Sequence, residues 1–548
     1  MSAKRILIVG GVAAGSSAAT RARRLDEEAE IVVFERGAHV SFANCGLPYH
    51  VGDVIEDEED LLLVSPQTFA ERFDIDVRVR HEVLSIDRER RELLVANLGD
   101  GSRRKERYDA LVLATGAGAF RPPVPGLDLP GVFTLRTVPE SRELRQWLDA
   151  REAKRAVVVG AGFVGLETAE NLRHRGLDVT VVEFQNQVIP ALDAEMATPV
   201  AEHLREQGVE LVLGDGLSAI EETREGAMRV RTGQGKALDA DVVILALGVR
   251  PRTDLAKRAG ITTGPRGGVV VDGAMRTNDP HIWAVGDVAE DRCVITGGVR
   301  LLSLAGPANR QGRMAADSIY GREMQFRGVQ GTSVCGLFGM TVAMTGLGQG
   351  ALASELDIED RSITLHPKDH VSYYPGAEKI HLKLIYEAKT GRVLGAQAVG
   401  QAGVAKRIDV IAMAIQMGAT VFDLEQAELC YAPQFGAAKD PVNMAGMIAA
   451  NELRGDLPAA AWRELVGADA LLVDVREADE FERGHVEGAI NLPLSELRGR
   501  LDELPTDRDI LLYCQSGKRS YDAVRALHQR GYRARTLVGG MESYLHQA

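Results

Sequence analysis

One glycine pattern constrains the fold of this chain more than any other feature. The apolar residues 157–159 lead directly into GAGFVG, where Gly160, Gly162 and Gly165 have the spacing of a dinucleotide-binding turn. A helix and then a strand ending at Glu183 follow. Free N–H groups at the start of such a helix favour a pyrophosphate, and the glycines let the backbone approach it. The segment therefore predicts a βαβ unit that binds a dinucleotide.

A second βαβ pattern stands at the start of the chain. Residues 5–9 are apolar, GGVAAG follows, and after an alanine-rich helix a strand ends at Glu35, 20 positions past Gly15. That separation suits a carboxylate that binds a ribose. Val12 replaces the middle glycine, so this copy alone does not separate a nucleotide site from an ordinary glycine turn. Taken with the first pattern, it predicts a second nucleotide-binding domain.

Other strand ends agree with two bound nucleotides. Three apolar runs each end in a turn of small residues, at 111–116, 244–248 and 282–287. The last run ends at Asp287, whose carboxylate suits a ribityl or ribose hydroxyl, although each run could also be a plain buried strand. No arginine or lysine follows Glu183 in residues 184–186 to hold a 2′-phosphate. We therefore expect NADH to be preferred over NADPH.

Bulk properties narrow the class of protein. A chain of 548 residues is long enough for several domains, and its net charge of −14 argues against nucleic-acid binding, although a local basic patch could still hold a small anion. The sequence has neither a signal-peptide pattern nor a membrane-length apolar stretch, so we expect a cytoplasmic protein without a membrane anchor. Five cysteines without a C-x-x-C pair predict neither a disulfide scaffold nor a metal site.

The two glycine turns and the three strand ends resemble the pyridine nucleotide–disulfide oxidoreductase family over residues 1 to about 450. The resemblance implies an FAD-binding domain interrupted by an NAD-binding domain and followed by a dimerisation domain. It implies the cofactors FAD and NADH, held by residues of the turns and strand ends. The cofactor-binding residues expected on this basis are Gly10, Ala14, Gly15, Glu35, Arg36, Thr115, Gly116, Asp287, Ala305, Gly160, Gly162, Gly165 and Glu183.

The last 90 residues or so form another small α/β pattern. A strand at 510–513 leads to Cys514 at the start of a helix, where backbone N–H groups and nearby cations should lower the pKa of a thiol. Arg519 comes five positions after Cys514, one fewer than in cysteine phosphatases, so the loop suits sulfur better than phosphate. The segment resembles a rhodanese domain. That resemblance implies a persulfide on Cys514, with Asp474 and Arg476 supporting the fold.

The expected fold class is thus α/β, with two Rossmann-like dinucleotide-binding domains, an α+β dimerisation domain and a C-terminal α/β rhodanese domain. The expected ranges are 1–145 for the first part of the FAD-binding domain, 146–265 for the NAD-binding domain, 266–325 for the second part of the FAD-binding domain, 326–450 for the dimerisation domain, 451–461 for a linker and 462–548 for the rhodanese-like domain.

Cys45 is the candidate redox cysteine of the first nucleotide domain. It lies in SFANCGLPY, where the following glycine and proline predict an irregular turn rather than a core strand. Its neighbours are Asn44 and Gly46, so no second thiol can form a disulfide beside it. A single thiolate can form a mixed disulfide or a persulfide with a small thiol. The substrate must then supply the second sulfur.

The segment around Cys45 resembles the coenzyme A–disulfide reductase branch of the family, although peroxidase and oxidase relatives also have a single cysteine. Ser17, Arg21 and Arg24 fall on one face of the first helix and could hold phosphates, or could form an ordinary solvated basic face. In the coenzyme A branch these positions match residues that bind the coenzyme. The implied coenzyme A site consists of Ser17, Arg21, Arg24, Ser41, Asn44, Asn309 and Lys439.

Two tyrosines extend the resemblance, Tyr373 in SYYPG and Tyr431 in LCYAP. A phenol can donate a hydrogen bond to a departing thiolate. By the spacing in the family we prefer Tyr373 to Tyr374. The resemblance implies that both phenols reach Cys45 of the partner subunit, which makes a homodimer obligatory. The remaining cysteines, Cys293, Cys335 and Cys430, we expect to be structural.

These features predict an NADH-dependent reductase of coenzyme A persulfides or polysulfides that releases hydrogen sulfide, with Cys45, Tyr373, Tyr431, Cys514 and Arg519 as catalytic residues. Its partners would be small coenzyme A thiols and a second copy of the chain. Three alternatives stay open: a coenzyme A–disulfide reductase that maintains thiol balance, an NADH oxidase or peroxidase that cycles Cys45 through a sulfenic acid, and a sulfur carrier whose flavin is structural.

Overall fold

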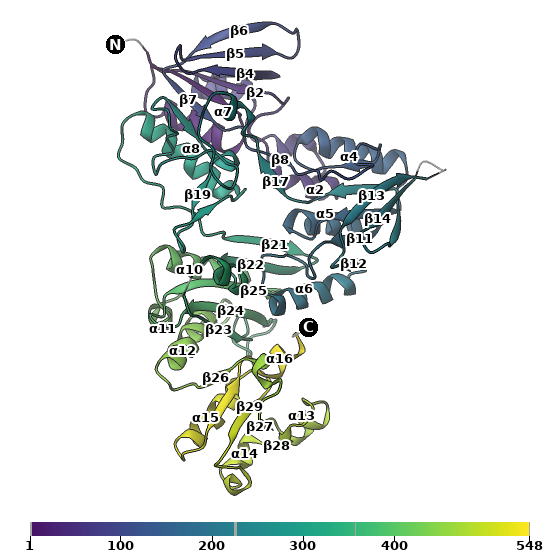
Figure 1. The fold of residues 1–548 in the computed structure, drawn as a ribbon, viewed down its shortest axis with the longest axis vertical. Coiled ribbons are helices and arrows are strands. Elements are labelled where there is room, and N and C mark those ends of the chain that lie inside the picture. The colour runs from purple at the N-terminus through teal and green to yellow at the C-terminus, as the bar shows by residue number, and fades with distance from the viewer. Residues whose placement is uncertain (1–2, 224–226, 357, 547–548) are drawn as a thin grey trace. The chain divides into compact units, whose positions relative to one another are not determined.

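The structure is a computed structural model that describes residues 3–223, 227–356 and 358–546. Its contacts divide the chain into two units (Figure 1). Unit 1 consists of residues 1–186 and 208–329, and unit 2 consists of residues 187–207 and 330–548. Within the described ranges no helix is both long and apolar enough to cross a membrane.

The first sheet of unit 1 is a five-stranded parallel sheet. Its strands, in spatial order, are β18 (Ile282–Ala284), β7 (Ala110–Leu113), β1 (Arg5–Val9), β2 (Glu30–Glu35) and β3 (Asp76–Val79). The run RILIV is apolar on both faces because both faces are covered. Ile6 and Ile8 pack on one side against helices α1 (Ala13–Arg23) and α8 (Ala305–Ile319).

The opposite face of this sheet is covered by a three-stranded antiparallel meander. The strands are β4 (His81–Asp87), β5 (Glu92–Asn97) and β6 (Arg103–Arg107), which Figure 1 shows as the blue-violet layer beside β2. Leu7 and Val9 of β1 share an apolar cluster with Val83 and Leu93 of the meander. Alternate residues of one strand therefore contribute to two different cores, as the period of a strand requires.

The second sheet of unit 1 repeats the design. Its parallel strands, in spatial order, are β12 (Val209–Leu213), β11 (Asp178–Glu183), β10 (Arg155–Val159), β16 (Val242–Leu245) and β9 (Val132–Phe133). Helix α5 (Phe163–His174) follows β10, and a meander of β13 (Leu217–Glu222), β14 (Met228–Thr232) and β15 (Ala237–Ala240) shares its core with β10. Two Rossmann-like domains are thus confirmed, and the three strands expected near 111, 244 and 282 are present.

Unit 2 begins with an antiparallel sheet and its helices. The sheet has the order β21 (Ser333–Leu337), β22 (Met340–Gly346), β25 (Val393–Gly400), β24 (Ile380–Glu387) and β23 (Asp360–Leu365). Its helices are α6 (Ala194–Glu206), α9 (Gln349–Glu355), α10 (Val404–Gln416), α11 (Val421–Gln426) and α12 (Pro441–Leu453). The combination of an antiparallel sheet with separate helices gives the α+β character expected for this region.

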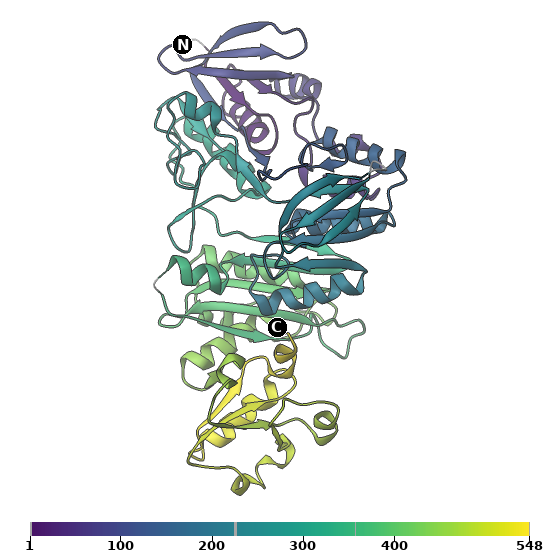
Figure 2. The same ribbon diagram turned by 45° about the vertical axis from the view of Figure 1, so that its right-hand side comes forward.

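The C-terminal part of unit 2 is a parallel sheet with the order β26 (Ala459–Ala460), β30 (Ala534–Leu537), β29 (Asp509–Tyr513), β27 (Ala470–Asp474) and β28 (Ile490–Asn491). Its helices are α13 (Ala478–Glu482), α14 (Leu494–Leu497), α15 (Lys518–His528) and α16 (Gly540–Leu545). The yellow ribbon of Figure 2 shows this part. The expected linker 451–461 overlaps the end of α12 at one end and contains β26 at the other.

Candidate functional site

The two glycine turns have the same backbone geometry. Gly10 has φ +100 and Gly160 has φ +109, a region that side chains rarely adopt. A Cβ on Gly10 would lie less than 3.0 Å from the carbonyl of Ala114, and a Cβ on Gly160 equally close to that of Ala246. Each first glycine is therefore needed for its turn to pass the neighbouring strand.

The two acidic strand ends also match. The carboxylate of Glu35 accepts hydrogen bonds from the N–H groups of Gly11 at 3.0 Å and Gly37 at 2.7 Å. The carboxylate of Glu183 accepts one from the N–H of Ala161 at 2.8 Å and one from the N–H two residues later at 2.8 Å. These bonds hold each carboxylate beside its glycine turn, where a ribose would lie.

Open space adjoins the turns. No protein atom lies within 4 Å of a Cβ built on Gly162, the N-cap residue of α5. The same holds for Gly116 and Gly248, which follow strands β7 and β16. Residues Gly15 and Gly165 are instead packed against the preceding turn, where a Cβ would lie less than 3.0 Å from a backbone oxygen. The turns, carboxylates and open space together fit two dinucleotides.

Asp287 lies just past β18 and is held by Arg136. The Nη2 atom of Arg136 lies 3.4 Å from the Asp287 carboxylate, and burial raises the pKa of Asp287 although the arginine opposes the shift. Thr115 donates its hydroxyl proton to the carbonyl of Arg252 at 2.8 Å. Ala305 is the first residue of α8. The other two expected cofactor residues are Ala14, buried in the α1 core, and Arg36, 3.6 Å from Glu82.

Cys45 lies in a short 3₁₀ turn, Asn44–Gly46, that leads into helix α2 (Leu47–Val51). Cys45 is exposed, yet the surrounding protein partly removes water from its thiol, and this desolvation raises the pKa of Cys45. The carboxylate of Glu167 raises it further, and Arg136 lowers it. All five cysteines belong to the described residues and are free, so Cys45 has no disulfide partner.

Glu167 is a residue of this site that the sequence argument missed. It lies on α5, two residues after the third glycine, and burial raises its pKa to about 7. The phenol of Tyr49, four residues after Cys45, donates to Glu167 at 3.3 Å. Glu167 therefore changes its charge near neutral pH beside the thiol. The only signal in the sequence was its place in the helix of the second glycine turn.

Three of the seven expected coenzyme A residues lie on α1 and α8, and Arg24 directly follows α1. The Ser17 hydroxyl donates to Asn309 Oδ1 at 2.5 Å, so these two residues are together. Arg21 is not an open cation, because it forms an ion pair of 2.6 Å with the buried Asp317. Arg24 lies over the ring of Phe73 at 5.7 Å. The basic face is thus already partly neutralised by neighbouring side chains.

The other three expected coenzyme A residues lie on loops. Ser41 has φ +47 and donates its N–H to the Gly11 carbonyl at 2.8 Å, which places it beside the first glycine turn. Asn44 donates to the Arg136 carbonyl at 3.3 Å. Lys439, in unit 2, is exposed and lies two residues before α12.

Tyr373 and Tyr431 are brought together in unit 2. Their hydroxyl groups lie 3.0 Å apart, and this hydrogen bond raises the pKa of Tyr373. Tyr373 is 72% exposed and Tyr431 is 47% exposed. Tyr374 packs instead against His370, with ring centroids 5.7 Å apart. Of the two neighbouring tyrosines, Tyr373 is therefore the one that pairs with Tyr431.

Cys514 follows β29 directly, in the loop before α15 that was expected. The side chain is buried, and the N–H of Gly517 donates to its Sγ at 3.2 Å. Gly517 has φ +96, which turns its N–H toward the sulfur. The loop is therefore built around a sulfur atom.

Charged pairs surround the Cys514 loop. Arg519 forms two hydrogen bonds with Glu480, of 2.5 and 2.7 Å, which lower the pKa of Glu480 to about 2. Arg476 is buried and binds Asp474 through Nη2 at 2.7 Å and through Nε at 2.9 Å. Glu480 is a second residue that the sequence argument missed, because it lies on a different helix from its partner.

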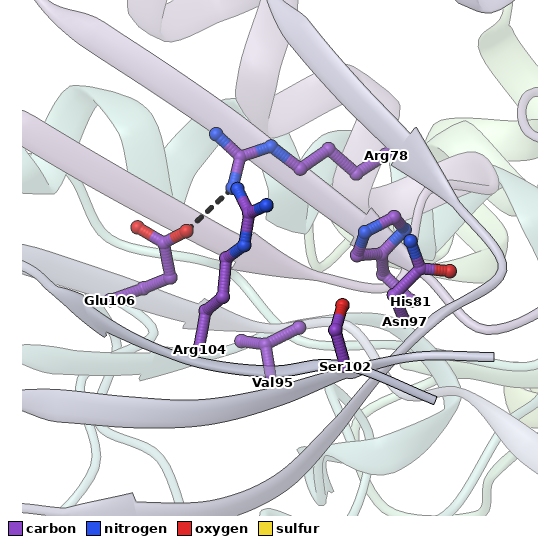
Figure 3. Close-up of a pocket in the computed structure, with 7 residues that line it drawn as sticks. All are labelled: Arg78, His81, Val95, Asn97, Ser102, Arg104 and Glu106. Carbon is purple, nitrogen blue, oxygen red and sulfur yellow. Dashed lines mark hydrogen bonds and ion pairs between the residues drawn. The ribbon is translucent and has the colours of Figure 1, made fainter. Parts of the chain in front are cut away.

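A polar cavity of about 240 Å³ lies elsewhere in unit 1, between β3 and the meander β4–β6. Figure 3 labels its seven lining residues, none of which was expected in a site. The side chains of Arg78 and Arg104 converge there, and Arg78 is paired with Glu106 at 2.6 Å. The cavity is thus distinct from both cysteine sites.

Known proteins share this arrangement over the full chain. Residues 4–312 match the pyridine nucleotide-disulphide oxidoreductase family, residues 332–440 match the dimerisation domain of that family, and residues 457–547 match the rhodanese-like domain. The coenzyme A disulfide reductase of Staphylococcus haemolyticus is 33% identical over 444 residues, which cover 81% of this chain and 98% of that protein.

Two solved structures are similar throughout. The reduced CoADR-RHD of Bacillus anthracis is 43% identical, with a TM-score of 0.97 over 100% of this chain and 98% of that chain. An NAD-dependent persulfide reductase from A. fulgidus is 38% identical, with a TM-score of 0.92 over 98% of this chain and 100% of that chain. The chain therefore belongs to the pyridine nucleotide-disulphide oxidoreductase family and carries a rhodanese-like domain.

Proposed function

We propose that the chain is an FAD-containing, NADH-dependent reductase of coenzyme A persulfides or polysulfides that releases hydrogen sulfide, and that Cys514 supplies the sulfane sulfur. The observation that carries the proposal is the single thiol at Cys45, which has no second cysteine beside it. The second sulfur must then come from the substrate. The names of the relatives support a coenzyme A disulfide or a persulfide as the substrate of this chain. In this proposal the domains keep the ranges predicted from the sequence.

The residues of unit 1 would hold the cofactors. The turn after β1, with Glu35 and Asp287, would hold FAD, and the turn after β10, with Glu183, would hold NADH. When bound, FAD supplies to a sulfur–sulfur bond the two electrons that it takes from NADH. Backbone hydrogen bonds hold the Glu183 carboxylate beside the turn, where it would accept a hydrogen bond from a ribose hydroxyl and repel a 2′-phosphate.

Cys45 performs the nucleophilic step. Its thiolate attacks the outer sulfur of a coenzyme A persulfide, which forms a persulfide on Cys45 and releases the coenzyme A thiolate. Two electrons and two protons then convert the Cys45 persulfide into the thiol and hydrogen sulfide. Because desolvation raises the pKa of Cys45, a base would have to take its proton. Glu167 is the candidate, since its charge acts on the thiol and its own pKa is about 7.

The tyrosine pair would assist the departing thiolate. Tyr431 and Tyr373 form an exposed hydrogen-bonded pair, and one phenol can donate to a thiolate while the other holds it in place. We propose, as the family implies, that this pair reaches Cys45 of the partner subunit in a homodimer. Exposure of both phenols in a single chain supports this, because the pair is available to another chain.

Cys514 would load the substrate. Its thiolate takes the outer sulfur of a polysulfide or another sulfane donor and releases the rest of the donor as a thiolate. The coenzyme A thiolate then takes that sulfur, which regenerates Cys514 and forms the coenzyme A persulfide. Arg519 would stay near this sulfur as a fixed positive charge, oriented by Glu480. Two sites in one chain raise the effective concentration of the intermediate.

Coenzyme A would be held by the seven residues expected from the sequence, with Asn309 and Ser17 already in contact. Arg21 would have to turn from Asp317 toward a phosphate, or hold the phosphate while still paired. Arg21→Ala and Arg24→Ala are each expected to raise KM for coenzyme A persulfide. An unchanged KM in both variants would rule out this phosphate site.

The experiment that tests the function compares anaerobic NADH consumption with coenzyme A persulfide, coenzyme A disulfide and peroxide. We expect persulfide to be fastest, the reaction to be lost in Cys45→Ser, and preformed persulfide still to be reduced by Cys514→Ser. Fastest turnover of the disulfide would make the chain a coenzyme A–disulfide reductase. Fastest turnover of peroxide would indicate a sulfenic acid cycle at Cys45.

A further inference from the structure

The loop that carries Cys514 is held by the last helix of the chain. At the start of α16 the N–H of Met541 donates to the carbonyl of Cys514 at 2.8 Å, and the N–H of Glu542 donates to the carbonyl of Gln515 at 3.0 Å. Gly540 has φ +63, and a Cβ there would lie less than 3.0 Å from the Cys514 carbonyl. The first turn of α16 is therefore fitted against the backbone of the Cys514 loop.

The side chain of Glu542 continues this contact in two directions. Its Oε1 atom accepts a hydrogen bond from Gln515 Nε2 at 3.4 Å and from Lys379 Nζ at 2.9 Å. Glu542 is only 9% exposed, so its charge is screened less than that of a surface residue. Lys379 directly precedes β24. One carboxylate oxygen thus contacts both the Cys514 loop and the antiparallel sheet.

A histidine forms a second contact beside the first. His366, which follows β23, has its Nε2 atom 2.9 Å from the Ser543 hydroxyl and its Nδ1 atom 2.9 Å from Nδ1 of His381. Burial lowers the pKa of His366 to about 2, so the imidazole is neutral and one nitrogen donates while the other accepts. A Cβ on Gly539 would lie less than 3.0 Å from Ser543, which leaves no room for another residue there.

These contacts reach the segment that carries Tyr373. His366 and Lys379 are the two ends of this segment, which we call the tyrosine segment, and its ends are joined where the N–H of Ile380 donates to the carbonyl of Pro367 at 2.8 Å. Figures 1 and 2 show α16 close to the sheet from which the segment projects. The base of the tyrosine segment and the Cys514 loop therefore share one support, the first turn of α16.

We propose that Glu542 is a positioning residue for both chemical sites, because its carboxylate ties the Cys514 loop to the base of the tyrosine segment through Lys379. The inference rests on the proposed roles of Cys514 and Tyr373. Sulfur transfer and support of a departing thiolate both need groups held within fractions of an ångström, and a displaced support lowers the rate without removing a reacting group. A single contact at the shared support should therefore affect two reactions.

Glu542→Gln is the matched perturbation, because it keeps the shape of the side chain and the backbone contact with Gln515 but removes the charge. Sulfur transfer from thiosulfate to cyanide measures the Cys514 site. NADH-dependent reduction of whichever persulfide, disulfide or peroxide reacts fastest measures the Cys45 site. We expect kcat of both reactions to fall roughly three- to tenfold, with FAD content and thermal midpoint unchanged.

Lys379 provides the second arm of the test. Lys379→Met should lower the same two rates as Glu542→Gln. The double variant should be little slower than either single variant, because both changes remove the same contact. The exchanged pair, Glu542→Lys with Lys379→Glu, should recover much of both rates. If Glu542→Gln does not fold, Lys379→Met decides alone, because the changed side chain is 46% exposed.

Glu496→Gln is the control in the same domain. It removes an exposed ion pair of 2.6 Å between Glu496 on α14 and Arg500, which follows that helix. We expect no change in either rate. The inference is overturned if Glu542→Gln alters neither reaction or only sulfur transfer, or if the control shows equal losses. The preference among sulfur substrates, which decides the proposed function, does not enter these comparisons.

Discussion

Replacement of Gly162 by alanine separates the needs of the fold from those of nucleotide binding. Gly162 has φ −77 and ψ 179, which alanine adopts without strain, and a Cβ there would meet no protein atom within 4 Å. Alanine lowers the conformational entropy of the unfolded chain, which stabilises the folded state by ~0.4–1 kcal/mol. A weaker N-cap offsets part of this gain. We therefore expect the free energy of unfolding to change by no more than about 1 kcal/mol.

The new methyl group should instead meet the nucleotide. It lies where the backbone of the turn is expected to approach the pyrophosphate of NADH, and an overpacked contact costs about 1–3 kcal/mol. KM for NADH should rise by roughly ten- to a hundredfold. Gly160→Ala is the contrasting variant, because its φ is +109 and its Cβ would press on the Ala246 carbonyl. That change should cost about 1–3 kcal/mol of backbone strain in addition to overpacking.

The assay is urea unfolding of both variants together with initial rates over a range of NADH concentrations. The expected pattern is a stable Gly162→Ala with weak NADH binding and a destabilised Gly160→Ala. The reasoning is refuted if Gly162→Ala loses as much stability as Gly160→Ala, or if it keeps the KM of the wild type. The first result would mean that the fold does not tolerate a side chain at Gly162, and the second would mean that the open space beside the turn is not the pyrophosphate site.

Three further predictions concern unit 2. Burial lowers the pKa of His381 to about 4 from the ordinary 6.5, so its neutral form contributes stability that is complete above pH 6.5 and is lost as the pH falls toward 4. Urea unfolding should show a loss of stability between about pH 6.5 and 5 that is smaller in His381→Gln by on the order of 2 kcal/mol, and equal losses would contradict this. Arg476→Met should lower the free energy of unfolding by about 3–5 kcal/mol, because it leaves the buried Asp474 carboxylate unpaired; a loss below about 1 kcal/mol in a denaturant titration would count against a buried pair. Tyr373→Phe should keep the stability of the wild type within about 0.5 kcal/mol, since the ring is exposed, and slow substrate reduction roughly tenfold or more; stopped-flow rates equal to those of the wild type would exclude the phenol from the reaction.

Short-range chain geometry determined the parts of this protein that the sequence predicted. The glycine turns with Glu35 and Glu183 could be located because a positive φ, a helix start and a strand end are all decided by neighbouring residues. The same holds for Cys514, whose loop lies between an apolar strand and a helix, as predicted. The strand positions and the two Rossmann-like domains follow from the period of the apolar residues.

Only the tertiary structure decided which charged and polar groups meet. Arg21 was expected on an open basic face, but the folded chain pairs it with Asp317 of another helix. The charge of Glu167 acts on Cys45, and Glu542 contacts both the Cys514 loop and the base of the tyrosine segment, although these groups are remote in sequence. Local patterns do not contain such pairings, because a pairing depends on how separate elements pack and on how much water that packing removes from each charge.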